Sequence, residues 1–252
     1  MSSDKATSAM EESLRDDEAT LEDIKASPEE LALLEEMIKA GVLHGRKHSF
    51  TNPKMNKYVI ATRKGIDVID LEATNEMLER AGNYLKILVD SKRPILVVGT
   101  RAETRDLVEK FADSFAFPKV TGRWLGGTLT NYPTIWKRIE YMKKLRADKL
   151  SGALEKYTKK ERLMLTNELA RLNNLFSGIE TMSVKPAAMI VIDANLHKHA
   201  VHEANLLEIP VIALINTDTN PDKITYPIPR NFTGRSSLEF ILTKLSSKLR
   251  SA

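Results

Sequence analysis

The sequence offers few side chains whose types and spacing suit chemistry. His197, His199 and His202 lie close to Asp193 and Glu203. His199 and Glu203 are four residues apart, so both could face one side of a helix and hold a metal ion. His197 would lie off that face, and the chain has no cysteine, the commonest further ligand of zinc sites. The favoured interpretation is therefore that these histidines bind no metal.

Two glycine-containing segments could bind phosphate. Gly99-Thr100-Arg101 follows an apolar run, a position where α/β sheets often bind ligands, but it has no second glycine. Gly122-Arg-Trp-Leu-Gly-Gly127 is richer, yet no Lys-Ser/Thr pair follows it as in a phosphate-binding loop. Arg123 and Trp124 suit pairing with phosphate and stacking on bases or sugars. A structural turn with a packed tryptophan is an alternative that these residues leave open.

The common enzymatic signatures are missing from the sequence. It contains neither G-x-x-x-x-G-K-[ST] nor G-x-G-x-x-G after an apolar strand. No serine, histidine and acid stand in a pattern typical of nucleophilic catalysis. We therefore expect no catalytic residue, no cofactor and no small-molecule substrate.

The basic residues are unevenly distributed. The chain has a net charge of +4, but residues 1–40 hold 4 Lys/Arg against 12 Asp/Glu. Residues 41–65 hold six basic residues and no acid, and residues 131–162 hold ten basic residues against four acids. These two windows, each with a net charge of +6, account for the whole surplus of the remaining chain. A single charge run is usually a solvated face, whereas two such windows indicate a protein that binds a polyanion.

Composition limits the class of protein. With 252 residues, 42% hydrophobic and 29% charged, the chain resembles a globular protein with a full core. It has no apolar run of about 18 residues, which a bilayer span requires, and its N-terminus lacks a signal-peptide pattern. We therefore expect a cytoplasmic protein with no membrane partner. Residues 1–26 are polar, acidic and aperiodic, which predicts a disordered tail.

Alternating strand and helix patterns predict an α/β domain. A helix should begin after the capping Ser27, with Pro28 in its first turn, and end at Gly41. Further helices are expected at 71–91, 102–115, 198–207 and 234–250, and strands at 58–62, 66–70, 94–99, 117–120, 187–193 and 210–216. This alternation favours a mostly parallel sheet flanked by helices, as in flavodoxin-like and Rossmann-like folds, over residues 27–130 and 180–252.

A different pattern interrupts the α/β domain. Leu165, Leu169, Leu172, Phe176 and Ile179 follow a spacing of 4, 3, 4, 3, which is a heptad pattern. Ile135, Ile139 and Met142 repeat the 4, 3 spacing upstream, and a segment with Ser151-Gly152 separates the two runs. We therefore predict a protruding antiparallel coiled-coil hairpin over residues 131–179, with a basic first half that contacts an anionic partner.

Several short strings together resemble the bacterial small-subunit ribosomal protein S2 family, over residues 34–249. The strings, in order, are Ala40-Gly-Val42, Asn52-Pro-Lys-Met55, Val98-Gly-Thr100, Arg123-Trp-Leu-Gly-Gly127, Leu129-Thr-Asn131, Thr158-Lys-Lys-Glu161, Val191-Ile-Asp-Ala194, Glu203-Ala-Asn205, Ile209-Pro-Val211 and Asn220-Pro-Asp222. The chain departs from the family at Gly41-Val-Leu-His-Gly-Arg46, usually Gly-Val-His-Phe-Gly-His, and at Thr51, usually an aromatic residue.

The resemblance implies a structural, non-catalytic protein bound to small-subunit rRNA between the head and body of the ribosomal subunit. It implies neighbouring ribosomal proteins as partners and, in many bacteria, docking of the RNA-binding ribosomal protein S1. Three regions carry the expected RNA contacts: the basic segment 45–57, the loop 123–131 and the hairpin. The residues predicted to contact RNA are Arg46, Lys47, Lys54, Lys57, Arg63, Arg123, Trp124, Asn131, Lys137, Arg138, Lys143 and Lys144.

Two other functions compete with this interpretation. One is a nucleotide-dependent enzyme on the same α/β scaffold, because a fold alone does not fix function. The other is a non-ribosomal interaction protein that uses the hairpin, with its charge serving only solubility. Missing phosphate-binding glycines argue against the first, and salt-dependent association with ribosomal subunits would separate the second from an rRNA-binding protein.

Overall fold

The computed structural model describes residues 28–182, 184–232 and 234–250. The predicted disordered tail, residues 1–26, and the predicted cap Ser27 lie outside the described residues. The first described helix is α2 (Pro28–Lys39), and Gly41 follows it with φ +71°, the left-handed conformation that commonly ends helices.

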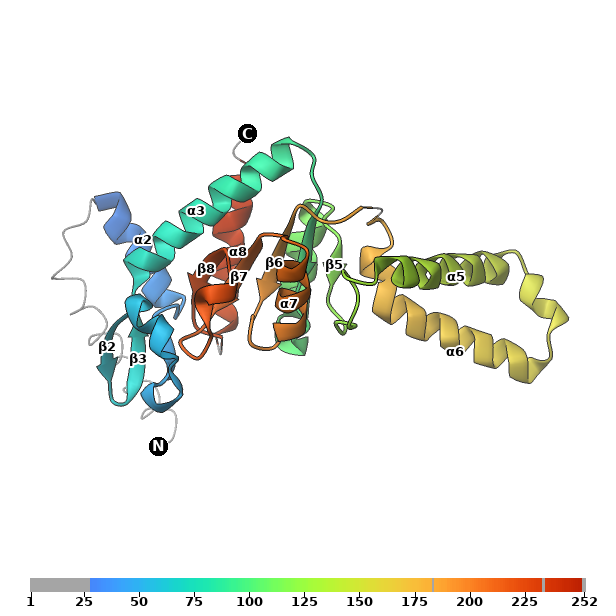
Figure 1. Cartoon of the computed structure of the whole chain (residues 1–252), viewed down its shortest axis with the longest axis horizontal. Helices are drawn as coiled ribbons and strands as arrows, with labels where there is room; N and C mark the ends of the chain where they lie inside the picture. The colour runs from blue at the N-terminus through green and yellow to red at the C-terminus, as the bar shows by residue number, and fades with distance from the viewer. Residues whose placement is uncertain (1–27, 183, 233, 251–252) are drawn as a thin grey trace, which may run out of the picture.

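A five-stranded parallel sheet forms the centre of the molecule (Figure 1). Its strands are β4 (Ile95–Val98), β5 (Lys119–Val120), β6 (Ala188–Ile192), β7 (Val211–Ile215) and β8 (Tyr226–Pro229), in the order β5-β4-β6-β7-β8. Continuous apolar runs form β4, β6 and β7, which are buried on both faces. The predicted parallel sheet flanked by helices is confirmed. Strand β8 was not predicted, because Pro227 and Pro229 argue against a strand inside a sheet. It lies at the edge of the sheet, where prolines are tolerated.

Helices cover both faces of this sheet. One face packs against α3 (Leu71–Asp90), α4 (Arg105–Ser114) and α8 (Arg235–Arg250). The other packs against α7 (Lys198–Leu206) and the base of a long helical insertion. Side chains alternate between the faces: Ile95 and Val97 contribute to the first core, and Leu96 and Val98 to the second. Short 3-10 helices also occur, at His48–Phe50, Pro53–Tyr58, Ala102–Thr104, Ala153–Lys156, Ser177–Ile179 and Pro221–Lys223.

A separate antiparallel sheet lies beyond β8, at the left of Figure 1. It contains β1 (His44–Lys47), β2 (Val59–Arg63) and β3 (Ile66–Ile69), in the order β1-β3-β2. Lys64 and Gly65, with φ +50° and +78°, form the two-residue turn between β2 and β3, as in type I′ hairpins. The sequence pattern predicts β2 and β3 but does not separate them from the parallel sheet, and it does not predict β1.

The segment between β5 and β6 forms the two predicted helices, α5 (Tyr132–Leu150) and α6 (Lys159–Phe176). They lie side by side and project from the β5 edge (Figure 1). Thr158 begins α6 with a capping box, because its side chain and that of Glu161 bond each other's backbone N–H groups. The heptad supercoil of a coiled coil, and the division of the chain into separate structural units at residues 131 and 179, remain predictions.

Two glycines set how closely the insertion approaches the sheet. A Cβ atom at Gly178 would lie 2.2 Å from the carbonyl oxygen of Lys119 in β5, and one at Gly122 would lie 2.7 Å from that of Asn174. Both distances are far below a van der Waals contact, so a side chain at either position would push the insertion away from β5.

Apolar residues of both helices hold the hairpin together. Ile135, Ile139 and Met142 of α5 are buried in the same cluster as Leu169 and Phe176 of α6. This cluster continues into the core between the parallel sheet and α7. The base of the hairpin therefore shares its core with the α/β domain.

Replacing Leu169 with Ala should lower the free energy of unfolding by roughly 2–5 kcal/mol, the range for truncating a buried leucine. Leu169 is 5% exposed, and the hairpin is only two helices thick, so the lower part of that range is expected. Urea denaturation would measure the change, and Leu163→Ala on the exposed side of α6 is the matched control. Equal losses for the two variants would contradict burial along this contact.

Candidate nucleic-acid interface

The first group of predicted RNA contacts lies on the small antiparallel sheet and on the 3-10 helix Pro53–Tyr58, between β1 and β2. Arg46 and Lys47 end β1, Lys54 and Lys57 lie on the helix Pro53–Tyr58, and Arg63 ends β2. All five side chains are exposed. The window of residues 41–65 is therefore gathered at one end of the molecule.

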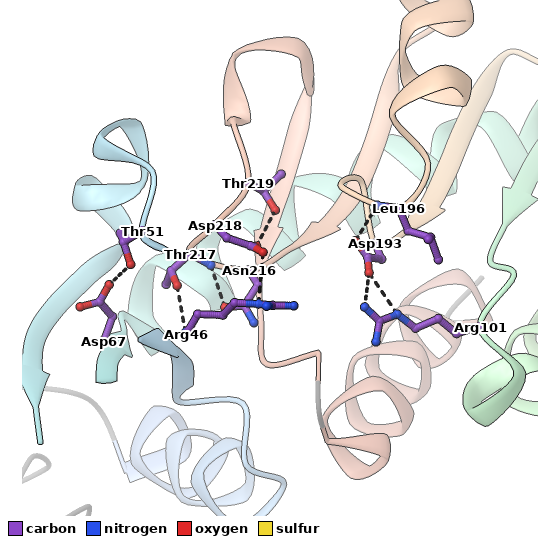
Figure 2. A network of polar contacts seen from close by, with 10 residues as sticks. All are labelled: Arg46, Thr51, Asp67, Arg101, Asp193, Leu196, Asn216, Thr217, Asp218 and Thr219. Carbon is purple, nitrogen blue, oxygen red and sulfur yellow. Dashed lines mark hydrogen bonds and ion pairs between the residues drawn. The ribbon is translucent and has the colours of Figure 1, made fainter. Parts of the chain in front are cut away.

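Thr217, in the loop that follows β7, anchors this group to the parallel sheet (Figure 2). Its Oγ1 accepts a hydrogen bond of 3.0 Å from the backbone N–H of Arg46, and its carbonyl oxygen accepts one of 2.8 Å from Asn52. A Cβ atom at Gly45 would lie 2.7 Å from Cγ2 of Thr217, so only glycine permits this approach. The small sheet is therefore held against the carboxyl ends of the parallel strands.

Two of the predicted RNA contacts also bind acids of the same region. Arg46 Nε lies 3.1 Å from Asp218 Oδ2, and Lys54 Nζ donates to Asp222. These ion pairs are at least partly exposed to solvent, so each stabilises the fold only weakly. Arg46 and Lys54 are exposed and can still contact a phosphate, but the neighbouring carboxylate neutralises part of the positive charge of each. Lys57 lies over the ring of Tyr58, 4.9 Å from its centroid.

A buried carboxylate shapes the turn between β1 and the helix Pro53–Tyr58. Asp67 is fully buried and accepts hydrogen bonds from Thr51 and Thr62, and His48 Nδ1 lies 2.8 Å from its Oδ1. Burial alone would raise the pKa of Asp67, but these partners hold it below its usual value. Thr51 therefore has a structural role in this chain (Figure 2).

The second group of predicted contacts lies on the loop between β5 and α5, which is organised by Glu203 of α7. Glu203 Oε1 accepts hydrogen bonds from Trp124 Nε1 (3.0 Å) and the backbone N–H of Gly127 (2.9 Å). Its Oε2 accepts from the backbone N–H groups of Leu129 (3.0 Å) and Thr130 (3.3 Å). One buried side chain therefore fixes the path of this loop.

The hydrogen bonds that Glu203 accepts from this loop, called here the loop clamp, explain where the loop residues point. Arg123 and Asn131 are exposed, whereas Trp124 is half-buried and its indole N–H is used by Glu203. Sequence reasoning considered Glu203 as a possible metal ligand with His199 and as part of a family string, but not as a partner of this loop. The signal it missed is that Ala200, Glu203 and Ala204 share the buried face of α7, so the carboxylate must find its partners inside the protein.

The loop clamp should weaken in acid. Burial alone would raise the pKa of Glu203, but its hydrogen-bond donors lower it below the usual 4.5. A lowered pKa means that the clamp contributes its full stability above about pH 4.5 and loses it as the pH falls through the lower, folded-state pKa. In a Trp136→Phe background, which leaves one tryptophan, Trp124 emission should shift to the red in this range. An identical shift in Glu203→Gln would contradict this assignment.

The third group lies on α5. Lys137, Arg138, Lys143 and Lys144 are all exposed on this helix. Lys143 Nζ donates to the carbonyl oxygen of Glu180 at 3.0 Å and lies 5.2 Å from the centroid of the Trp136 ring. Because the hairpin and the small sheet project from opposite sides of the parallel sheet (Figure 1), the structure does not bring the two basic windows together.

Side chains of the protein pair with one another at the carboxyl ends of β4 and β6, where the strand order reverses. Arg101 Nε donates to Asp193 Oδ2 at 3.0 Å, and Thr100 Oγ1 lies 3.1 Å from His197 Nε2 (Figure 2 shows the first pair). Arg230 is buried beside them, its guanidinium 4.9 Å from the Phe232 ring centroid. Gly99–Arg101 therefore begins an ion-paired junction.

Of the three histidines considered as metal ligands, His197 lies apart from the other two. His197 is buried, with Nδ1 2.8 Å from the carbonyl oxygen of Asp193, whereas His199 and His202 are exposed on α7. Among the residues that the structure describes, no three His, Asp or Glu side chains are placed to hold a metal ion. None of the helices described is long and apolar enough to cross a membrane.

Comparison with known proteins identifies the family. The family model of ribosomal protein S2 matches residues 37–251. The small ribosomal subunit protein uS2c of Cyanophora paradoxa is 36% identical over 219 residues, 87% of this chain and 94% of that protein. The uS2 proteins of Salinibacter ruber and Corynebacterium diphtheriae are 37% and 39% identical, over 86% and 85% of this chain and 68% and 80% of their own lengths. The chain belongs to the ribosomal protein S2 family.

Proposed function

We propose that the protein is a structural constituent of the small ribosomal subunit that binds small-subunit rRNA. Its relatives carry the name of a small-subunit ribosomal protein. The observation in this chain that supports the role is the placement of its positive charge. The entire surplus of residues 41–252 lies in two windows at opposite ends of the molecule, mostly on exposed side chains. Such an arrangement fits a protein that joins two RNA segments.

The positions of the two basic windows also suggest how the protein contacts the RNA. The small sheet contacts one rRNA segment, and the basic face of α5 contacts another, between the head and the body of the subunit. The predicted RNA residues act by neutralising phosphates, so no catalytic residue or cofactor is needed. The protein works within cytoplasmic ribosomes, next to other small-subunit proteins. Ribosomal protein S1 is a further proposed neighbour.

Co-sedimentation with small ribosomal subunits tests the proposal. Subunits lacking this protein should carry it into the pellet at low salt and release it at high salt, because phosphate contacts weaken as salt rises. Absence from the pellet at both salt concentrations would contradict a ribosomal role. Binding that persists unchanged at high salt would instead favour an interaction held by apolar protein contacts.

A further inference from the structure

A cavity of about 430 Å³ opens at the carboxyl edge of the parallel sheet. It lies between the start of α7 and the loop that joins β7 to β8, and ten residues within 194–202 and 219–224 line it. Parallel α/β sheets bind ligands outside the carboxyl ends of their strands. The volume is within the roughly 300–1,000 Å³ typical of ligand sites. The position and size are therefore those of a binding site.

The floor of this cavity is apolar. Ala194, Val201 and Ile224 line it and are themselves buried. The imidazole rings of His199 and His202 belong to its walls and are exposed to solvent. A flat ring could therefore cover aliphatic surface below while contacting an aromatic ring at the side.

The rim of the cavity is cationic. Lys198 and Lys223 stand on its two sides, one on α7 and the other on the 3-10 helix Pro221–Lys223, and both are exposed. No acid is among the ten residues that line the cavity. An anionic group that enters would meet positive charge from both walls.

The acids near this rim are engaged elsewhere. Asp193 pairs with Arg101, Asp218 with Arg46, and Asp222 with Lys54. Glu203, on the same helix as Lys198, accepts its hydrogen bonds from the loop 124–130. The ion pairs of Asp193 and Asp218 therefore neutralise two carboxylates near the cavity, and Asp218 also accepts a hydrogen bond from Thr219, which lines the cavity (Figure 2).

We propose that this cavity receives one unpaired nucleotide of the bound RNA, with its base on the apolar floor and its phosphate between Lys198 and Lys223. An apolar floor beneath a cationic rim matches a flat base joined to a phosphate, and RNA-binding proteins commonly take up unstacked bases against aromatic rings, histidine among them. This inference rests on the proposed rRNA-binding function and adds a third contact, between the two basic windows. A base held in the sheet edge would fix the position of the protein on the RNA.

Photo-cross-linking of the full-length protein to small-subunit rRNA tests the inference. Mass spectrometry should find nucleotide adducts on residues 194–202 or 219–224. The double variant Lys198→Glu, Lys223→Glu should lose these adducts and weaken rRNA binding about tenfold, because it replaces two phosphate-binding cations. The matched control is Lys92→Glu, Lys185→Glu, which makes the same charge change at the opposite edge of the sheet, on exposed residues. The control should keep both the adducts and the affinity.

The alternative results are distinct. If the wild-type protein binds rRNA but the adducts lie only elsewhere, and both double variants bind alike, the cavity inference is wrong and the proposed function stands. If the wild-type protein binds no rRNA, both fail. Micromolar binding of adenosine monophosphate, displaced by neither rRNA nor an rRNA fragment, would assign the cavity to a free nucleotide. In assembled subunits, cross-links from the cavity to a protein rather than to RNA would also overturn the inference.

Discussion

Replacing Glu203 with Ala should lower the free energy of unfolding by about 4 kcal/mol. The substitution leaves the indole N–H of Trp124 and the backbone N–H groups of Gly127, Leu129 and Thr130 without their acceptor. Each buried donor that loses its partner costs about 1–3 kcal/mol. Water can enter the vacated space and satisfy some of them, so the total is expected below the simple sum.

Hydrogen exchange gives this prediction a local readout. The amides of Gly127, Leu129 and Thr130 should lose protection in Glu203→Ala, while the amides of β6 and β7 keep it. Glu208→Ala is the matched control, because Glu208 follows the same helix and is exposed. If the loop amides remain protected and the unfolding free energy is unchanged, Glu203 does not hold the loop.

The parts of the fold that the sequence could predict are those with a strong local signal. The apolar runs of β4, β6 and β7 are buried on both faces, and the heptad spacing marked α5 and α6. Strand β1, with the sequence His-Gly-Arg-Lys, carries no such signal. It becomes a strand because β3 pairs with it and Gly45 lets it approach Thr217, a contact between residues far apart in the chain.

The candidate interface could be predicted only in part, for the same reason. Charge counting found the two basic windows, and the glycine-rich segment with Arg123 and Trp124, together with the family resemblance, marked the loop 123–131. It could not show that the windows lie at opposite ends of the molecule, because their arrangement depends on the order of strands in the sheet. It could not show that Arg46 and Lys54 pair with Asp218 and Asp222, about 170 residues later in the chain. Long-range contacts of this kind leave no local pattern.

Reversing charge in either basic window should weaken rRNA binding by about tenfold or more and reduce its dependence on salt. The variants avoid Lys54 and Lys143, which have structural partners. Lys54→Glu would place a second acid beside Asp222, and Lys143 donates a hydrogen bond to a backbone carbonyl. Lys47→Glu with Lys57→Glu tests the small sheet. Lys137→Glu with Lys144→Glu tests the hairpin. Each pair should flatten the slope of log affinity against log salt by about 2 units, since each phosphate that is no longer neutralised removes about 0.9 (the duplex DNA value).

Titrating a small-subunit rRNA fragment across salt concentrations, with the wild-type protein and these two double variants, tests the central claim most directly. The wild-type slope should be steep, and each variant should have a weaker affinity and a flatter slope. Lys92→Glu with Lys185→Glu should match the wild type, and deleting residues 1–26 should not weaken binding, because that segment is acidic and repels phosphate. Equal affinity and slope for the wild type and both window variants, or loss of binding on deleting residues 1–26, would contradict an rRNA interface at the two windows.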